Sequence, residues 1–248
     1  MYKTEPLSVP VEGRSLDARF AEPAGALPGV LLVHGWDSDQ GHYRDRAEDI
    51  AALRCVALTF DLQGHGRDGA RSAEVSRADN LKDVLAACDR LCAHPRVDPG
   101  AIALIGTSYG GYLAAIASAL RPVRWLALRV PALYADTQWD TPKARLDRDE
   151  IAGYRRRVQP PEGNRALTAC AAFGGDVLVV GSADDAVVPP ATIRSYVQAF
   201  RTANSITHRS LPGADHLLSD ERARRGYDSL LNSWLSEMLL ASCAQSGR

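Results

Sequence analysis

AIALIGTSYGG, residues 101–111, is the stretch that decides the fold of this 248-residue sequence. An apolar run leads into the pattern Gly-x-Ser-x-Gly around Ser108, and a small-residue helical pattern follows at once. This order predicts a buried strand, a sharp turn with the serine at its tip, and a helix directly behind it. The serine backbone in such a turn is strained, and a Cβ at either flanking glycine would collide with the adjacent strand and helix.

The rest of the chain alternates between short strand patterns and helical ones. An alternating hydrophobic pattern over residues 4–21 predicts a β-hairpin, and later apolar runs predict buried strands. We call the predicted turn around Ser108, residues 106–110, the elbow. Together with the strand that leads into it, these patterns predict an α/β fold whose mostly parallel sheet has helices on both faces, in one domain over residues 1–248. The further predicted strands lie at residues 30–33, 55–60, 123–128, 176–180 and 205–211.

Residues 131–172 interrupt this rhythm with four prolines and a charged run, and they are too many for a plain strand-to-helix connection. We expect a small cap insertion over the strand ends; the alternative is a solvated surface excursion. Five of its arginines could receive an acidic substrate, although we favour a solvated helix face. These arginines are Arg145, Arg148, Arg155, Arg156 and Arg157.

Composition excludes several classes of protein. The formal net charge is −1, so neither nucleic acid nor an anionic membrane is an expected partner. The five cysteines are scattered without a CxxC pair, which predicts neither a disulfide framework nor a zinc site. No signal peptide is expected at the N-terminus, and the apolar stretch 101–120 is broken at the elbow, so no membrane span is expected. We therefore predict a cytoplasmic protein.

A serine hydroxyl becomes a nucleophile only when a base takes its proton and a carboxylate orients that base. His216, in a Gly-Ala-Asp-His turn after the last strand, is the best candidate base. Asp184 and Asp185 both follow the strand at 176–180 and compete for the role of the acid. The backbone amides of Trp36 and Tyr109 are the candidate donors to an oxyanion.

Other histidines receive weaker assignments. His34 directly follows a buried strand and is expected to hold its loop by hydrogen bonds. His42 and His65 could line the cleft.

Together these residues resemble the α/β-hydrolase superfamily. The matching segments are His34-Gly35-Trp36, Asp61-Leu62-Gln63-Gly64-His65-Gly66, the elbow itself, Gly181 to Pro189, and Gly213-Ala214-Asp215-His216. Within this superfamily, the sequence most resembles compact serine esterases of the dienelactone-hydrolase and feruloyl-esterase kind. The resemblance implies an eight-stranded α/β-hydrolase fold with a short insertion after the sixth strand.

The resemblance also bears on the acid of the triad. The family places it four residues before the proline of an Asp-x-x-Val-Pro turn, and Asp185 has this spacing to Pro189. Asp184 instead has the shorter spacing from Gly181 that many members show. We predict Asp185 as the acid.

The predicted activity is that of a serine carboxylesterase that cleaves small carboxylic esters through an acyl-enzyme, without metal or organic cofactor. Activity should fall in acid, because a protonated His216 cannot accept a proton. A peptidase, amidase or thioesterase would use the same residues, and a non-catalytic binding protein on this fold is a further alternative. The serine at the elbow, in place of aspartate or cysteine, argues against a dehalogenase, an epoxide hydrolase or dienelactone hydrolysis itself.

Overall fold

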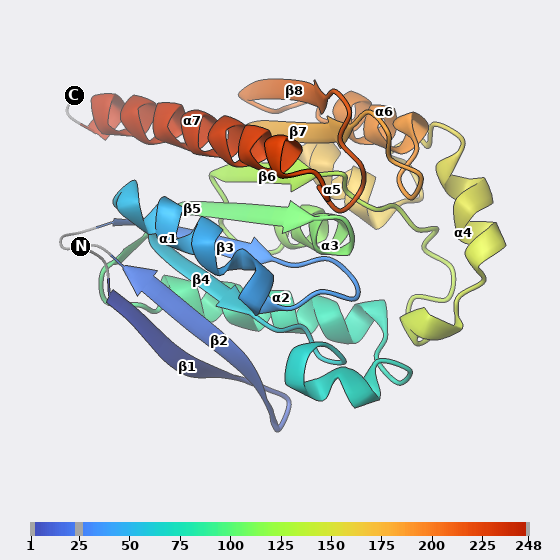
Figure 1. Ribbon diagram of the computed structural model, residues 1–248, viewed down its shortest axis with the longest axis horizontal. Helices are drawn as coiled ribbons and strands as arrows, with labels where there is room; N and C mark the ends of the chain where they lie inside the picture. Colours follow the sequence, from blue (N-terminus) through green and yellow to red (C-terminus); the bar gives the residue numbers. More distant parts are fainter. Residues whose placement is uncertain (1–2, 23–26, 247–248) are drawn as a thin grey trace.

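The computed structural model describes residues 3–22 and 27–246, and its centre is one open, mostly parallel sheet (Figure 1). The strand order is β1-β2-β4-β3-β5-β6-β7-β8. β2 runs antiparallel to β1 and to β4, and every other neighbouring pair is parallel. The predicted hairpin and eight-stranded sheet are therefore confirmed. The strands are β1 (Lys3–Val11), β2 (Arg14–Glu22), β3 (Leu27–Val33), β4 (Val56–Phe60), β5 (Val97–Thr107), β6 (Trp125–Arg129), β7 (Asp176–Ser182) and β8 (Ser205–Leu211).

Helices cover both faces of this sheet, as predicted (Figure 1). Alternate residues of β3 pack into different cores: Val30 and Leu32 lie in the core under α1 and α7, while Leu31 and Val33 lie in the core under the other helices. No helix in the described part of the chain is long and apolar enough to cross a membrane. The two faces carry α1 (Arg44–Ala52) with α7 (Glu221–Ser246), and α2 (Arg77–Cys92) with α3 (Tyr109–Ala117), α5 (Arg165–Ala172) and α6 (Pro190–Ala199).

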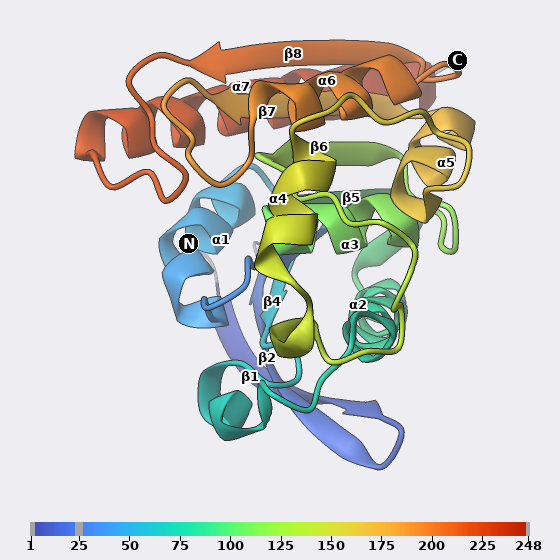
Figure 2. The ribbon, with the colours of Figure 1, turned by 90° about the vertical axis from the view of Figure 1, so that its right-hand side faces the viewer.

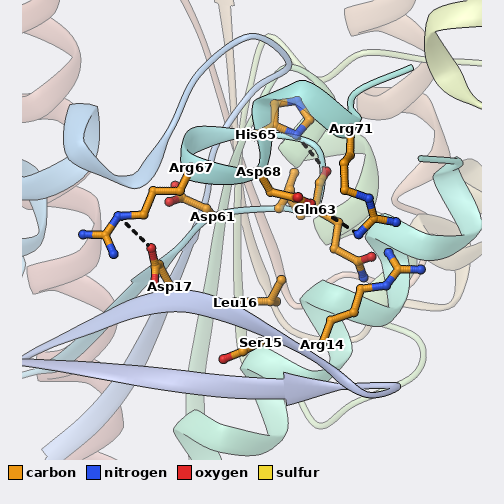
Figure 3. A pocket seen from close by; sticks show the side chains of 11 residues that line it. Arg14, Ser15, Leu16, Asp17, Asp61, Gln63, His65, Arg67, Asp68 and Arg71 are labelled. Atoms are coloured by element: carbon orange, nitrogen blue, oxygen red, sulfur yellow. Dashed lines mark hydrogen bonds and ion pairs between the residues drawn. The ribbon is translucent and has the colours of Figure 1, made fainter. Parts of the chain in front are cut away.

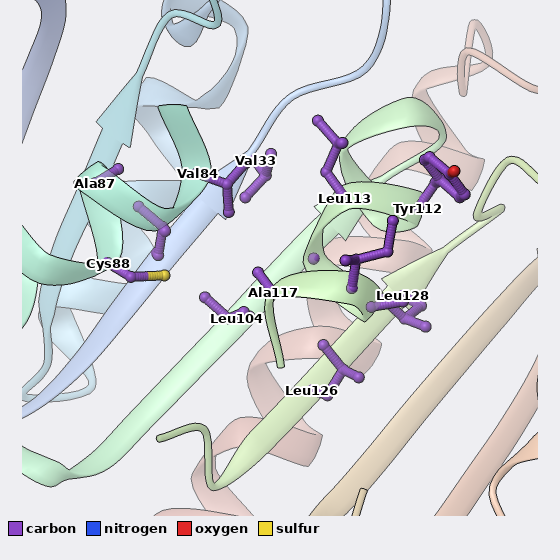
Figure 4. Packing of buried hydrophobic residues seen from close by; sticks show 14 of the residues in the cluster. Val33, Val84, Ala87, Cys88, Leu104, Tyr112, Leu113, Ala117, Leu126 and Leu128 are labelled. Atoms are coloured by element: carbon purple, nitrogen blue, oxygen red, sulfur yellow. The ribbon is translucent and has the colours of Figure 1, made fainter. Parts of the chain in front are cut away.

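The helix behind the elbow, α3, is buried along its whole length, and Figure 4 shows its side chains packed with those of α2 against the sheet. Small residues such as Ala117 allow this close approach. The sequence pattern predicts helix as far as Leu120, but α3 ends at Ala117. After Ala117 the amides of Ala119 and Leu120 donate to carbonyls three residues earlier, so the α-helix gives way to a tighter turn before Pro122.

Residues 131–172 divide into two parts. η3 (Lys143–Arg145) and α4 (Arg148–Arg155) lie over the carboxyl ends of the strands, where Figure 2 shows α4 in front of the sheet. In contrast, α5 packs into the main core through the buried Leu167 and Cys170. The segment over the strand ends therefore finishes before α5 begins.

Candidate active site

Ser108 stands between β5 and α3 with a strained backbone, φ 53° and ψ −116°. The Ser108 amide donates to the carbonyl of Arg129 at 2.9 Å, which ties the turn to β6. A Cβ at Gly106 would lie 2.5 Å from the Gly110 carbonyl oxygen, and one at Gly110 would lie 2.3 Å from the Val33 oxygen. The predicted reason for both glycines is therefore confirmed.

The structure brings Ser108, His216 and Asp185 into one hydrogen-bonded chain. His216 Nε2 lies 3.0 Å from Ser108 Oγ, and His216 Nδ1 lies 2.8 Å from Asp185 Oδ2. Because a carboxylate can only accept, Nδ1 carries the proton and the lone pair of Nε2 faces the hydroxyl. Asp184 is exposed, and its contact with this region is a bond from its backbone amide to Ala214.

Asp185 is held as an acceptor from three sides. Its Oδ1 accepts the amides of Val187 and Val188 at 2.7 and 2.8 Å, while Oδ2 faces His216. Burial pushes the pKa of this carboxyl upward, but the hydrogen bonds from His216 and the two amides outweigh burial and lower the pKa below its ordinary value. Asp185 is therefore an anion at neutral pH.

The loop after β3 brings the Trp36 amide close to the elbow. A Cβ at Gly35 would lie 3.5 Å from Ser108 Cβ, so the loop passes directly over the serine. Trp36 and Tyr109 also meet through their rings, edge to face with centroids 5.3 Å apart. Neither of the two amides donates to another residue in the described ranges, which leaves both available to a further acceptor.

His34 holds this loop as predicted. Its Nδ1 lies 2.7 Å from the Gly35 carbonyl oxygen, and its Nε2 accepts the Leu62 amide at 3.0 Å. Burial lowers the pKa of His34 to about 4, so the ring is neutral. The buried His65 packs edge to face against Trp36, whereas His42 is exposed and lies beside Asp39.

Arg129, at the end of β6, is a site residue that we did not predict. Its Nη2 donates to the His216 carbonyl at 2.7 Å and to the Asp215 carbonyl at 3.3 Å, while its own carbonyl accepts the Ser108 amide. It is 4% exposed, and its guanidinium stacks over the Tyr227 ring. The sequence did contain a signal for this residue: Arg129 directly follows an apolar run, and an arginine in such a buried position needs hydrogen-bond partners because arginine is seldom fully buried.

A buried polar network lies beneath the elbow and was also not predicted. The Tyr109 hydroxyl donates to Asn80 Oδ1 at 3.0 Å, and Asn80 Nδ2 donates to Asp83 Oδ2 at 3.1 Å. Asp83 also accepts the amide and side chain of Gln63, which connects the loop after β4 to α2. Burial raises the pKa of Asp83 to about 6. The network fixes the side chain of Tyr109, which is the residue next to Ser108.

Four of the five cap arginines are solvated, as we predicted, and one is not. Arg145, Arg148, Arg156 and Arg157 are exposed, but Arg155 is buried. Arg155 donates to the carbonyls of Leu133 and Val187 at 3.0 and 3.3 Å. The amphipathic pattern of α4 did not identify this arginine, because its partners are carbonyls in distant loops.

A separate pocket of about 290 Å³ lies between the end of the β1–β2 hairpin and the loop after β4 (Figure 3). Residues 14–17 and parts of 61–71 line it, and Ser108 does not. Arg67 is paired with Asp17 at 3.1 Å in this pocket. In the ranges that the structure describes, no group of three His, Cys, Asp or Glu side chains is placed to hold a metal ion.

The fold and the serine–histidine–aspartate arrangement together define an α/β-hydrolase type of protein. A family model described as "Alpha/beta hydrolase family" matches residues 30–228, and the chain belongs to this family. The chain is 34% identical over 137 residues to the pimeloyl-[acyl-carrier protein] methyl ester esterase of Chromobacterium violaceum. That match covers 54% of this chain and 49% of the relative, so the matched part spans about half the length of this curated relative.

Two solved structures share the fold across nearly the whole chain. A dienelactone hydrolase from Anabaena variabilis superposes with a TM-score of 0.70 at 18% identity, over 95% of this chain and 98% of its own. Est1E from Butyrivibrio proteoclasticus with bound ferulic acid gives 0.72 at 17% identity, over 96% and 99%. The predicted resemblance to these compact hydrolases is therefore confirmed for the fold.

Proposed function

We propose that this protein is a serine hydrolase that cleaves small carboxylic esters through an acyl-enzyme. One observation carries the proposal: the unbroken chain from Ser108 Oγ through the His216 ring to Asp185, with contacts of 3.0 and 2.8 Å. The proposed substrate is a small-molecule ester. In this proposal η3 and α4, which lie over the strand ends, face the substrate.

In the proposed reaction, Ser108 Oγ attacks the ester carbonyl carbon while His216 Nε2 takes the hydroxyl proton. The amides of Trp36 and Tyr109 hold the oxyanion of the tetrahedral intermediate. His216 then returns the proton to the leaving alcohol, and the acyl group remains on Ser108. Water, deprotonated by the same nitrogen, releases the acid and restores the serine. Asp185 stabilises the imidazolium that forms in both halves.

A fluorophosphonate probe and a panel of p-nitrophenyl esters of rising chain length test this proposal. We expect labelling and turnover in the wild type, loss of both in Ser108→Ala, and retention of both in Ser118→Ala, a matched change at the other end of α3. Best activity on short acyl chains supports the small-ester assignment, and best activity on long chains contradicts it.

Amide and thioester substrates distinguish the related activities, since the same groups can transfer any acyl group. A higher kcat/KM on a thioester or an anilide than on the matched ester would replace the esterase assignment. Failure of Ser108 to react with the probe in a folded protein would favour a binding protein instead.

A further inference from the structure

Three cations surround the ring of Tyr134 beneath the cap: Arg77, Lys143 and Arg155, here called the cation cluster. Their charged groups lie 5.5, 6.0 and 4.7 Å from the Tyr134 ring centroid. Arg77 donates to the carbonyls of residues 135, 137 and 138, and Arg155 donates to two other carbonyls. Within the described ranges, none of the three has a carboxylate partner within 4.0 Å. The positive charge of the cluster is therefore not neutralised by direct contact.

Lys143 is the member of the cluster that lies over the rings of Trp36 and Tyr109. Its Nζ lies 3.6 Å from the centroid of the Trp36 ring and 5.2 Å from that of the Tyr109 ring. The backbone at this point is fixed, because the Lys143 amide donates to the Val75 carbonyl at 3.0 Å. Trp36 and Tyr109 carry the two proposed oxyanion amides, so Lys143 lies against the side chains of the two residues that would hold the ester carbonyl.

The surroundings of Lys143 disfavour its charge. Burial, and after it the charge of Arg155, lower the pKa of Lys143 to about 7. Asp37, which is exposed, acts in the opposite direction. A partly desolvated cation without a counterion costs free energy, and a bound anion removes that cost. A carboxylate on the substrate has the charge to do this.

We propose that Lys143 selects esters that carry a carboxylate, with Arg77 and Arg155 adding to the positive field. This inference rests on the proposed ester hydrolysis at Ser108. The carboxylate could belong to the acyl part or to the alcohol part of the ester, and two pairs of substrates distinguish these sources. The acyl pair is the p-nitrophenyl monoester of glutaric acid and neutral p-nitrophenyl pentanoate. The alcohol pair is 4-acetoxybenzoate and its methyl ester.

We expect the wild type to prefer the anionic member of one pair by about 10- to 100-fold in kcat/KM, which is the size of a charge-assisted contact. The preference should appear mainly in KM. Lys143→Met should bring the ratio close to one, and Lys143→Arg should keep most of it. Arg145→Gln is the matched control, because Arg145 is an exposed cation on the same short helix. This control should retain the wild-type ratio.

Two results would overturn the inference: a ratio near one in both pairs for the wild type, or an equal loss on all four esters in Lys143→Met. The second result would mean that Lys143 only supports Trp36. Glutarate provides a readout without turnover, since it should raise the melting temperature of the wild type but not of Lys143→Met. Absence of this stabilisation also contradicts the inference. If the wild-type protein showed no ester turnover and no probe labelling, that result would instead refute the proposed function.

Discussion

Replacing Asp185 by Asn tests the proposed triad with the smallest possible change in shape. The amides of Val187 and Val188 donate to Oδ1, so the asparagine oxygen will take that position and its NH₂ group will face His216. An NH₂ donor opposite Nδ1 requires a lone pair there, which moves the ring proton to Nε2. That nitrogen then points an N–H at Ser108 and cannot accept its proton.

The expected loss follows from this wrong tautomer. The Asp185 side chain is 1% exposed, so no water can take the place of the carboxylate at the 2.8 Å contact with His216. We expect kcat to fall by about 10⁴-fold, the effect of the same change in other serine triads, which corresponds to about 5 kcal/mol in the barrier.

Steady-state hydrolysis of p-nitrophenyl butyrate measures this loss, with the melting temperature as the test of folding. Asp184→Asn is the matched control, because Asp184 is the exposed neighbour, and its kcat should stay within about twofold of wild type, as surface changes away from a site do. A folded Asp185→Asn protein within tenfold of wild type would refute the reasoning, and a large loss in Asp184→Asn would transfer the role.

Three further predictions address the scaffold. Arg129→Met should lower kcat by about 10²-fold with little change in KM, because it releases the His216 carbonyl, and Arg129→Lys should recover part of the loss; equal rates in all three proteins would contradict a positioning role. Gly110→Ala should reduce the free energy of unfolding by more than about 3 kcal/mol in urea titrations, since the added Cβ meets two backbone oxygens at 2.3 and 2.4 Å. Gly153→Ala in α4 is the control; it has open space around it and should be neutral or stabilising by up to about 1 kcal/mol. The pKa of His34 is lowered from 6.5 to about 4, so its contribution to stability is fully present above pH 6.5 and is lost progressively as the pH falls from 6.5 to about 4. Urea titrations should show about 2 kcal/mol less stability at pH 5 than at pH 7 from this residue, and His34→Gln should remove that part of the pH dependence.

The sheet and the elbow could be predicted from sequence because their signals are local. Residues 30–33 are apolar on both faces and sit in the middle of the sheet, and the glycines around Ser108 carry a steric requirement that the structure meets. The proposed triad could be predicted as a set because each member lies in the turn or loop that follows a strand. In a parallel sheet, such positions gather at one edge.

The cap and the supporting charges could not be predicted in the same way. Arg155 is buried by carbonyls at residues 133 and 187, which lie 22 and 32 positions away in the chain. Lys143 lies over Trp36, which is more than a hundred positions earlier. Neither contact leaves a periodic pattern, because carbonyls are present at every residue and an aromatic ring has many possible partners.

The order of the strands explains why Arg129 matters to the proposed chemistry. Ser108 follows β5 and Asp185 follows β7, with β6 between them, so their strands are separated by about 10 Å. The His216 ring bridges that gap with contacts of 3.0 and 2.8 Å. His216 comes from the loop after β8, which must therefore fold back across the end of β7. Arg129, at the end of β6, binds the carbonyls of that loop, and so the strand between the serine and the aspartate also holds the base between them.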